Sequence, residues 1–241
     1  MENHAYSEIL GQPDAPYLNS LARSGAVLTQ SYAVTHPSEP NYLALFSGST
    51  QGLSDDSCPH TFDGPNLAVA LHAAGRTFGA YSEDLPSVGF TGCSSGGRYA
   101  RKHAPWVNLS NVPAEANQPL SALPQEYRRL PTVSFVIPNL QNDMHDGTVA
   151  QGDSWLRTHL GGYAAWAGSH ASLLIVTADE DDTSHENRIP ALLVGAGVRV
   201  GEYAARTDHY GMLRMILDSY RLPPFGLASN AAAVSGVWAR P

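Results

Sequence analysis

The seven residues HPSEPNY, at positions 36–42, put a nucleophilic serine on a stiff turn directly before an apolar run. Pro40 suits the start of a helix, because its missing N–H would have no helical partner there. Ser38 therefore precedes a helix start, where free backbone N–H groups can hold a phosphate. A serine at this place can attack phosphorus while Asn41 stabilises the equatorial oxygens. A capped helix after a Pro-containing turn also explains the stretch, and these residues alone leave both interpretations open.

Three further stretches bring oxygen ligands and histidine together. TADEDD (177–182) offers Asp179 and Glu180 as ligands of a hard cation, and ENH at the start of the chain adds Glu2 and Asn3. NDMHDG (142–147) contains Asp143, His145 and Asp146, each of which can be a ligand or an acid/base group. A solvated acidic loop, a disordered terminus and a turn are the corresponding structural explanations.

Cationic candidates lie in two more stretches. YARKHAPW (99–106) contains Lys102, the only lysine of the chain, next to His103. A cation can neutralise phosphate, and a histidine can protonate a leaving oxygen. DHY (208–210) puts His209 at a predicted helix start, where Asp208 also serves as an ordinary N-cap.

The elements that must position these residues alternate along the chain. Runs rich in β-branched and aliphatic residues, without strict alternation, predict strands buried on both faces at 76–82, 132–138, 171–179 and 189–198. Helices are predicted at 15–25, 66–75, 153–168 and 209–222. This order favours an α/β fold, a three-layer sandwich with a mostly parallel central sheet. We expect a single domain over 1–241, with 83–125 as a loop-rich region over the active face.

Ligands of such sheets bind beyond the carboxyl ends of the strands. The residues that follow predicted strands are 82–86, 139–147 and 179–182, and two of these three stretches are strongly acidic. Carboxylates gathered at one sheet edge repel each other unless a cation, a shared proton or an arginine compensates. The pattern therefore predicts that a cation, a shared proton or an arginine compensates the carboxylates at this edge.

Composition limits the class of protein and its partners. The chain has 241 residues and a formal net charge of -8, with no basic stripe for nucleic-acid phosphates. No apolar run approaches the ~20 residues that span a bilayer, and no signal peptide is visible. Cys58 and Cys93 can form one disulfide or remain two thiols. A disulfide would imply an oxidising compartment.

Taken together, these stretches resemble one family. ENHAYSEILG, HPSEPNYLALFSGSTQG, YARKHAPW, IPNLQNDMHDG, TADEDD and DHY occur in the order seen in the phosphoesterase family of bacterial acid phosphatases and phospholipases C. That family belongs to the alkaline phosphatase superfamily. The likeness is closest to the secreted acid phosphatase branch known from mycobacteria, which acts on phosphomonoesters, including phosphoinositides. It extends from residue 2 to about residue 222.

The resemblance implies a role for each candidate. Ser38 matches the nucleophile that forms a phosphoserine, and Asn41 matches the asparagine beside the oxyanion. His103 and His145 match histidines at the phosphate or the leaving group. His209 more distantly resembles a superfamily histidine, and we expect His209 and Lys102 to be binding residues. The residues that match metal or phosphate ligands are Glu2, Asn3, Asp179 and Glu180.

The chain departs from the family pattern in two respects. The family has an apolar strand before its ENH stretch, with a signal peptide ahead of it, and neither is seen here. Either the chain is trimmed or its sheet lacks a first central strand; the resemblance still implies a secreted or cell-envelope protein. Two-metal relatives carry more Asp and His ligands than this chain matches. We therefore expect one divalent ion at most, Ca²⁺, Mg²⁺ or Zn²⁺, with Lys102 or a protonated histidine supplying the remaining positive charge.

Other functions stay open at this point. A phospholipase C-type phosphodiesterase and an inactive phosphate- or lipid-binding relative both fit the family. GCSSG (92–96) satisfies the G-x-S-x-G pattern of serine esterases through Ser94, and GDSW (152–155) is similar to a motif of other esterases. A sulfatase is disfavoured, because the chain has no C-x-P-x-R stretch.

Overall fold

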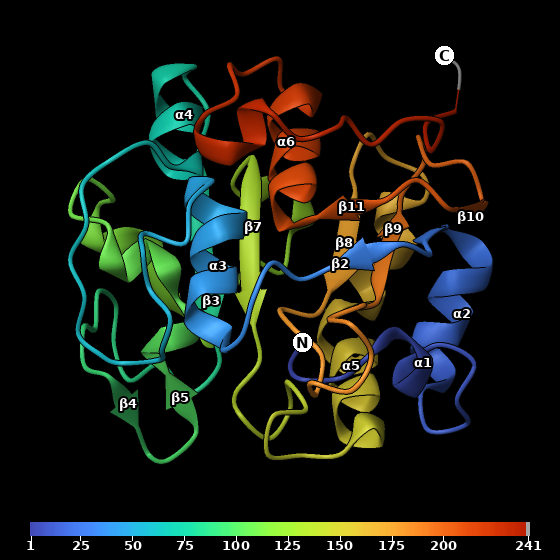
Figure 1. The fold of residues 1–241 in the computed structure, drawn as a ribbon, viewed down its shortest axis with the longest axis horizontal. Coiled ribbons are helices and arrows are strands. Elements are labelled where there is room, and N and C mark those ends of the chain that lie inside the picture. The colour runs from blue at the N-terminus through green and yellow to red at the C-terminus, as the bar shows by residue number, and fades with distance from the viewer. Residues whose placement is uncertain (240–241) are drawn as a thin grey trace. The chain divides into compact units, whose positions relative to one another are not determined.

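The computed structural model describes residues 1–239, which form two compact units built from separated stretches of chain (Figure 1). Unit 1 contains Met1–Val34, Gln141–Asp208 and the residues from Ala233 onward. Unit 2 contains Thr35–Leu140 and His209–Ala232. The expectation of a single domain over 1–241 stays a prediction. The candidate residues are divided between the units, because the chain passes from one to the other directly before HPSEPNY and within NLQNDMHDG.

Unit 1 contains a mixed four-stranded sheet in the order β10–β1–β9–β8. Its strands are β1 (Ala26–Leu28), β8 (Leu174–Thr177), β9 (Ala191–Val194) and β10 (Gly201–Tyr203). β1 runs parallel to β10, whereas β9 runs antiparallel to both of its neighbours. A second, short parallel ladder joins β2 (Ser31–Tyr32) to β11 (Thr207–Asp208). All four residues of β9 are buried, as its continuous apolar run predicts.

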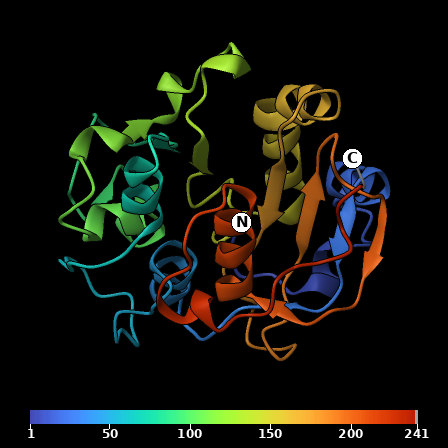
Figure 2. The ribbon, with the colours of Figure 1, turned by 90° about the horizontal axis from the view of Figure 1, so that it is seen from above.

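Helices α2 (Pro16–Ser24) and α5 (Val149–Ala167) pack against each other and against this sheet, and α1 (Tyr6–Ile9) precedes them (Figure 2). Pro16 opens α2 at a position where its missing N–H costs nothing. The buried Asp153 of α5 then accepts the next two backbone N–H groups, those of Tyr17 and Leu18, at 3.0 and 2.7 Å. A carboxylate of one helix thus caps the other and fixes how the two pack.

Unit 2 contains a parallel sheet in the order β6–β3–β7. Its strands are β3 (Phe78–Ser82), β6 (Asn117–Pro119) and β7 (Val133–Ile137), and a small hairpin joins β4 (Ser94–Ser95) to β5 (Tyr99–Ala100). Its helices are α3 (Ser38–Ser47), α4 (Leu67–Ala73) and α6 (His209–Ser219). The 3₁₀ turns of this unit are η1 (Arg101–His103), η2 (Pro105–Asn108), η3 (Ala114–Ala116), η4 (Leu120–Ala122), η5 (Tyr127–Arg129) and η6 (Gly226–Ser229).

An aromatic cluster forms the centre of unit 2. Phe46 of α3, Phe78 of β3, Trp106 of η2 and Phe135 of β7 contact one another, with ring centroids 5.2 to 6.2 Å apart. Aromatic side chains bury large apolar areas, so this cluster anchors the nucleophile-bearing helix against the sheet. The four predicted strands and four predicted helices are all present, with ends that differ by a few residues.

The directions of the strands need one correction. A mostly parallel sheet describes β6–β3–β7, but β9 is antiparallel to β1 and to β8. A run of apolar residues shows that a strand is buried and does not encode its direction. Among residues 1–239, the structure has no helix that is both long enough and apolar enough to cross a membrane.

Candidate active site

Ser38 is the first residue of α3, and 1% of its surface is exposed. The turn before it is held by Asn41, which is fully buried. The Asn41 amide donates to the carbonyls of Thr35 and Pro37, at 2.8 and 3.1 Å, and its oxygen accepts the Thr35 N–H at 3.2 Å. Asn41 therefore fixes the backbone that presents Ser38. Its predicted contact with an oxyanion stays a prediction.

The start of α3 offers fewer free N–H groups than the sequence suggests. The N–H of Glu39 donates to a carboxylate oxygen of Asp56 at 2.9 Å, and Pro40 has none to offer. A phosphate would therefore have to draw on side chains of unit 2 as well as on the helix backbone. No motif points to Asp56, because it lies on a loop 17 residues after Glu39.

Lys102 and His103 lie together on η1, which contacts α3. Lys102 Nζ donates to the second carboxylate oxygen of Asp56 at 2.9 Å. His103 is 2% exposed and stacks on Tyr42 of α3. His209, also 2% exposed, begins α6, and α6 packs against α3. Within unit 2, the structure thus brings the predicted nucleophile helix into contact with the elements that carry Lys102, His103 and His209.

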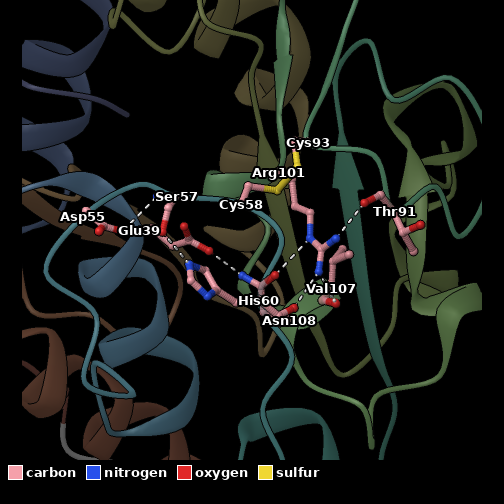
Figure 3. Close-up of a disulfide and its surroundings, with 10 residues drawn as sticks. All are labelled: Glu39, Asp55, Ser57, Cys58, His60, Thr91, Cys93, Arg101, Val107 and Asn108. Carbon is pink, nitrogen blue, oxygen red and sulfur yellow. Dashed lines mark hydrogen bonds between the residues drawn. A yellow bond between two sulfur atoms is a disulfide. The ribbon is translucent and has the colours of Figure 1, made fainter.

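A buried network of hydrogen bonds around Arg101 fixes the position of η1 (Figure 3). The Arg101 guanidinium donates to Asn108 Oδ1 and to the backbone carbonyls of Thr91, His60 and Val107. Asn108 in turn donates to Glu39 Oε1 at 2.6 Å. Figure 3 also shows the Cys58–Cys93 disulfide, which confirms the disulfide alternative for the two cysteines.

Burial shifts the pKa of two groups in this network. Burial lowers the pKa of Arg101, which neighbouring Tyr99 and Glu39 partly restore. Burial also raises the pKa of the Glu39 carboxyl, and Asp56 adds to this rise. His60, the hydrogen bond from Asn108 and Arg101 oppose it. Glu39 Oε2 is buried and has no hydrogen-bond partner among residues 1–239, as suits a carboxyl that resists ionisation.

In unit 1, the ENH stretch lies beside NDMHDG. The Glu2 N–H donates to the Asp143 carbonyl at 2.7 Å, and carboxylate oxygens of the two residues lie within 4.8 Å of each other. Both residues are completely buried. Asn3 has a φ of 42°, in the left-handed region that is strained for most residues. Its Oδ1 is buried and has no hydrogen-bond partner in the described part of the chain.

Asp179 and Glu180 follow β8 and are 5% and 3% exposed. The Asp179 N–H donates to the carbonyl of Met1 at 3.1 Å, while the amino group of Met1 donates to the Thr177 carbonyl at 3.2 Å. Met1 thus lies along the end of β8, and Glu2 follows it directly. The end of this strand is therefore where the predicted ligands of unit 1 meet.

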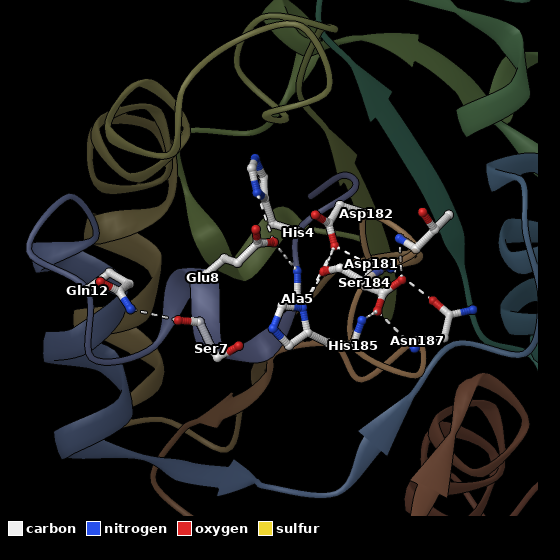
Figure 4. A network of polar contacts seen from close by, with 11 residues as sticks. His4, Ala5, Ser7, Glu8, Gln12, Asp181, Asp182, Ser184, His185 and Asn187 are labelled. Carbon is white, nitrogen blue, oxygen red and sulfur yellow. Dashed lines mark hydrogen bonds and ion pairs between the residues drawn. The ribbon is translucent and has the colours of Figure 1, made fainter.

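Asp181, the next residue of the acidic loop, holds the backbone of that loop in place (Figure 4). Asp181 is 1% exposed and accepts the backbone N–H groups of Thr183, His185 and Asn187. Asn187 Oδ1 accepts the Asp181 N–H at 2.9 Å. Asp181 therefore organises the loop that follows Glu180. Figure 4 also shows Glu8 of α1, which accepts the Ala5 N–H and so closes the turn after ENH.

His145 is held from both sides by acidic neighbours. Its backbone N–H donates to Asp143 Oδ1, and its Nδ1 lies 2.8 Å from Asp146 Oδ1. The preceding residue, Met144, has a φ of 86°, so the turn is strained where it presents the histidine. A carboxylate on Nδ1 orients the ring.

Two carboxylates of unit 1, those of Glu2 and Asp143, lie close enough to share a divalent ion. Asn3, Asp179 and Glu180 carry oxygens of the kind that Ca²⁺ and Mg²⁺ prefer, and their part in such a site stays a prediction. Buried carboxylates within 4.8 Å of each other repel, and a cation removes that repulsion. The buried Asn3 Oδ1 is an acceptor that such an ion would satisfy. The number and identity of the ion stay predictions.

The esterase alternatives find no support in the geometry. Ser94 lies in β4, the first strand of a two-stranded hairpin, and is exposed. A nucleophile elbow needs a strand followed by a helix, so the GCSSG stretch lacks its required context. The GDSW stretch lies inside α5, where its backbone continues the helix and forms no turn.

Comparison with known proteins decides the family. A profile of the Phosphoesterase family matches residues 5–223. The chain belongs to this family. It is 53% identical over 240 residues to the phosphatidylinositol-3-phosphatase of Mycobacterium tuberculosis, covering 98% of this chain and 80% of that protein. It is 30% identical over 227 residues to the phosphate-repressible acid phosphatase of Penicillium chrysogenum, covering 87% of this chain and 55% of that protein.

Two solved structures share the fold of this phosphoesterase. A protein of the alkaline phosphatase superfamily from Vibrio parahaemolyticus has a TM-score of 0.56 at 15% identity, with 86% of this chain and 60% of that chain covered. The lipoteichoic acid synthase LtaP from Listeria monocytogenes has a TM-score of 0.60 at 10% identity, with 98% and 72% covered. These matches confirm the predicted family and fold, and the relatives confirm the predicted enzyme class, phosphatase.

Proposed function

We propose that this phosphoesterase hydrolyses phosphomonoesters with Ser38 as its nucleophile. The observation that carries the proposal is the fixed position of Ser38 at the first residue of α3. Asn41 holds the turn before it, and Asp56 binds the N–H of the residue after it. A nucleophile held on both sides needs little reorganisation before an in-line attack.

In the proposed reaction, a neighbouring base takes the Ser38 hydroxyl proton as Ser38 Oγ forms a bond to phosphorus, and the bond from phosphorus to the substrate alcohol breaks. His103 or His145 gives a proton to the leaving alkoxide. Water then attacks the phosphoserine, which releases inorganic phosphate and restores the serine hydroxyl. Lys102 and His209 are the proposed partners of the phosphate oxygens, because phosphoryl transfer depends mainly on positioning and charge neutralisation.

Glu2, Asn3, Asp143, Asp179 and Glu180 are the residues that would hold a divalent ion. Such an ion supplies neutralisation of negative charge on phosphate oxygens. The protein's own contribution here is a set of buried oxygens whose backbone is fixed by the contacts of Met1 and Glu2 with the residues around them.

The proposed substrates are phosphoinositide-type lipid phosphomonoesters and small phosphomonoesters. The name of the mycobacterial relative, at 53% identity, supports the first class, and that of the fungal acid phosphatase supports the second. The Cys58–Cys93 disulfide supports a place of action in an oxidising compartment, at the cell envelope or outside the cell.

The test compares the unaltered protein with Ser38→Ala on p-nitrophenyl phosphate and on phosphatidylinositol 3-phosphate in vesicles, with and without chelator. Ser94→Ala is the matched control, since it alters the rival serine that the G-x-S-x-G pattern suggests. Ser38→Ala should abolish turnover of both substrates, and Ser94→Ala should not change it.

Each alternative has its own result. Turnover that survives Ser38→Ala would remove the nucleophile assignment. Hydrolysis of bis-p-nitrophenyl phosphate in preference to the monoester would favour a phospholipase C-type diesterase. Vanadate binding without turnover by the unaltered protein would favour an inactive phosphate-binding relative.

A further inference from the structure

One carboxylate of unit 2 joins the nucleophile helix to the only lysine of the chain. Asp56 Oδ1 accepts the Glu39 backbone N–H at 2.9 Å, and Asp56 Oδ2 accepts a hydrogen bond from Lys102 Nζ, also at 2.9 Å. The ammonium group is therefore separated by a single carboxylate from the backbone of the residue that follows Ser38. Neither family resemblance nor motif points to Asp56.

Capping of α3 alone does not explain this arrangement. Pro37 precedes the helix and has no side-chain acceptor, so a carboxylate at Asp56 does satisfy a helix N–H. A carboxylate at this place also repels a phosphate bound at the helix start, which a neutral Asn, Ser or Thr cap would avoid. The second oxygen holds a cation, which offsets that repulsion. Asp56 and Lys102 together therefore cap α3 without repelling a phosphate at its start.

The backbone around the pair is fixed on both sides. The Cys58–Cys93 disulfide links the loop that carries Asp56 to the hairpin that precedes Lys102. Arg101, next to Lys102, donates to the carbonyl of His60 in the Asp56 loop (Figure 3). With both backbones restrained, the flexible part that remains is the long Lys102 side chain, and the hydrogen bond to Asp56 restrains its ammonium group.

Exposure places the pair at a surface and not in the core. The Lys102 side chain is 18% exposed and the Asp56 side chain 26%. Ion pairs that water reaches contribute little to folding stability, so stability alone gives a weak reason for this contact. A cation that is partly exposed remains available to an anion from solution.

We propose that Asp56 is a positioning residue of the phosphatase reaction: it holds the Lys102 ammonium at the start of α3, where the ammonium neutralises the phosphate of the substrate. The proposal rests on the proposed function and adds to it a fixed position for Lys102. Asp56 itself touches neither the substrate nor the reacting atoms.

The experiment is a double-mutant cycle on kcat/KM for p-nitrophenyl phosphate, with Asp56→Asn, Lys102→Met and the combined variant. Asp56→Asn keeps an oxygen for the Glu39 N–H and presents an NH₂ donor to the lysine, so it releases Lys102 and leaves the cap. It should lower kcat/KM roughly 10- to 100-fold, the scale of a misplaced catalytic group. In the Lys102→Met background it should have no further effect.

Asp218→Asn is the matched control, because it breaks another ion pair of unit 2, Arg214–Asp218, on the exposed face of α6. It should leave kcat/KM and Tm unchanged. Isothermal titration with inorganic phosphate gives a second readout that needs no turnover. Asp56→Asn should weaken phosphate binding, and the combined variant should bind no more weakly than Lys102→Met.

Three results would overturn the proposal. The first is a fall in kcat/KM on Asp56→Asn that persists in the Lys102→Met background, which would mean that Asp56 acts on the structure of the protein and not through Lys102. The second is a lower Tm with unchanged kinetics and phosphate affinity. The third is a rise in kcat/KM, as expected if the carboxylate only repels substrate. Failure of the proposed function is a separate result, since it would appear as activity in Ser38→Ala.

Discussion

His103 stacks on Tyr42, with ring centroids 5.1 Å apart and an angle of 19° between the ring planes. Tyr42 lies on α3 one helical turn after Ser38, and residues four apart share a face of a helix. The stack therefore ties the orientation of the histidine to the helix that carries the proposed nucleophile. His103 lies in η1, whose backbone is fixed by the buried hydrogen bonds of Arg101.

If His103 protonates the leaving alcohol, the fall in rate caused by replacing His103 will depend on the leaving group of the substrate. His103→Ala should slow hydrolysis of an alkyl phosphate by roughly 10²–10⁴-fold, the usual contribution of general acid catalysis. p-Nitrophenyl phosphate should be affected far less, because p-nitrophenolate leaves without protonation. Tyr42→Leu should show the same preference more weakly, and Tyr42→Phe, which keeps the ring, should behave as the unaltered protein. Equal losses on both substrates would contradict the acid role, and the same series on His145 would then test the alternative.

Glu39 predicts a pH dependence of stability. Burial raises the pKa of its carboxyl, so the folded state favours the protonated form. Its contribution is therefore fully present below the ordinary glutamate pKa and is lost as the pH rises through the raised pKa of the folded state. The unaltered protein should lose free energy of unfolding relative to Glu39→Gln as the pH rises from the ordinary glutamate pKa to the raised pKa of folded Glu39. Below and above this pH range, the difference in free energy of unfolding between the two proteins should be constant.

Urea unfolding at stepped pH measures this difference. Glu39→Gln keeps the oxygen that accepts from Asn108, and the cost of its buried NH₂ group does not change with pH. Glu126→Gln, at an exposed position of the same unit, is the control and should leave the pH profile unaltered. A difference between Glu39→Gln and the unaltered protein that is flat at every pH would show that Glu39 is not the group that titrates.

Metal binding in unit 1 should be visible without any assay of activity. After treatment with chelator, addition of Ca²⁺, Mg²⁺ or Zn²⁺ should raise Tm, with about 2.7 kcal/mol of stabilisation when the ion reaches a hundred times its Kd. Asp179→Asn and Asn3→Ala should remove most of this shift. Glu202→Gln, on exposed β10, should retain it. A shift that survives both ligand variants would place the ion elsewhere, and no shift with any of the three ions would argue against a metal.

The Cys58–Cys93 disulfide should contribute substantially to stability. It closes a loop with a sequence separation of 35, and the loss of chain entropy for such a loop corresponds to about 3–4 kcal/mol. Cys58→Ser and the double variant with Cys93→Ser should be destabilised by similar amounts, since either one breaks the link. Urea unfolding of the oxidised, reduced and variant proteins measures this. A loss below about 1 kcal/mol would mean that the unfolded state is little constrained by the bond.

The candidate site could be predicted in part because its motifs are local. HPSEPNY contains its own turn and helix start, although α3 begins at Ser38, two residues before the predicted start at Pro40. The acidic residues after β8 could be placed because the end of a buried strand is a common site for ligands. Asp56 could not be found, because its two contacts join residues 17 and 46 positions away along the chain. The use of Asp181 as a loop organiser was equally hidden, since Asp179 and Asp181 look alike in sequence.

By itself, the sequence determined the order of strands and helices, the family and the chemical types gathered near Ser38 and near Asp179. Those features depend on short-range pattern: apolar periodicity, proline geometry and motif spacing. Only the tertiary structure decided that β9 runs antiparallel, that Cys58 bonds Cys93, and that Asp56 bridges Lys102 and α3. These are pairings between residues far apart in the chain, and they form only where packing of the whole unit repays the entropy of bringing them together.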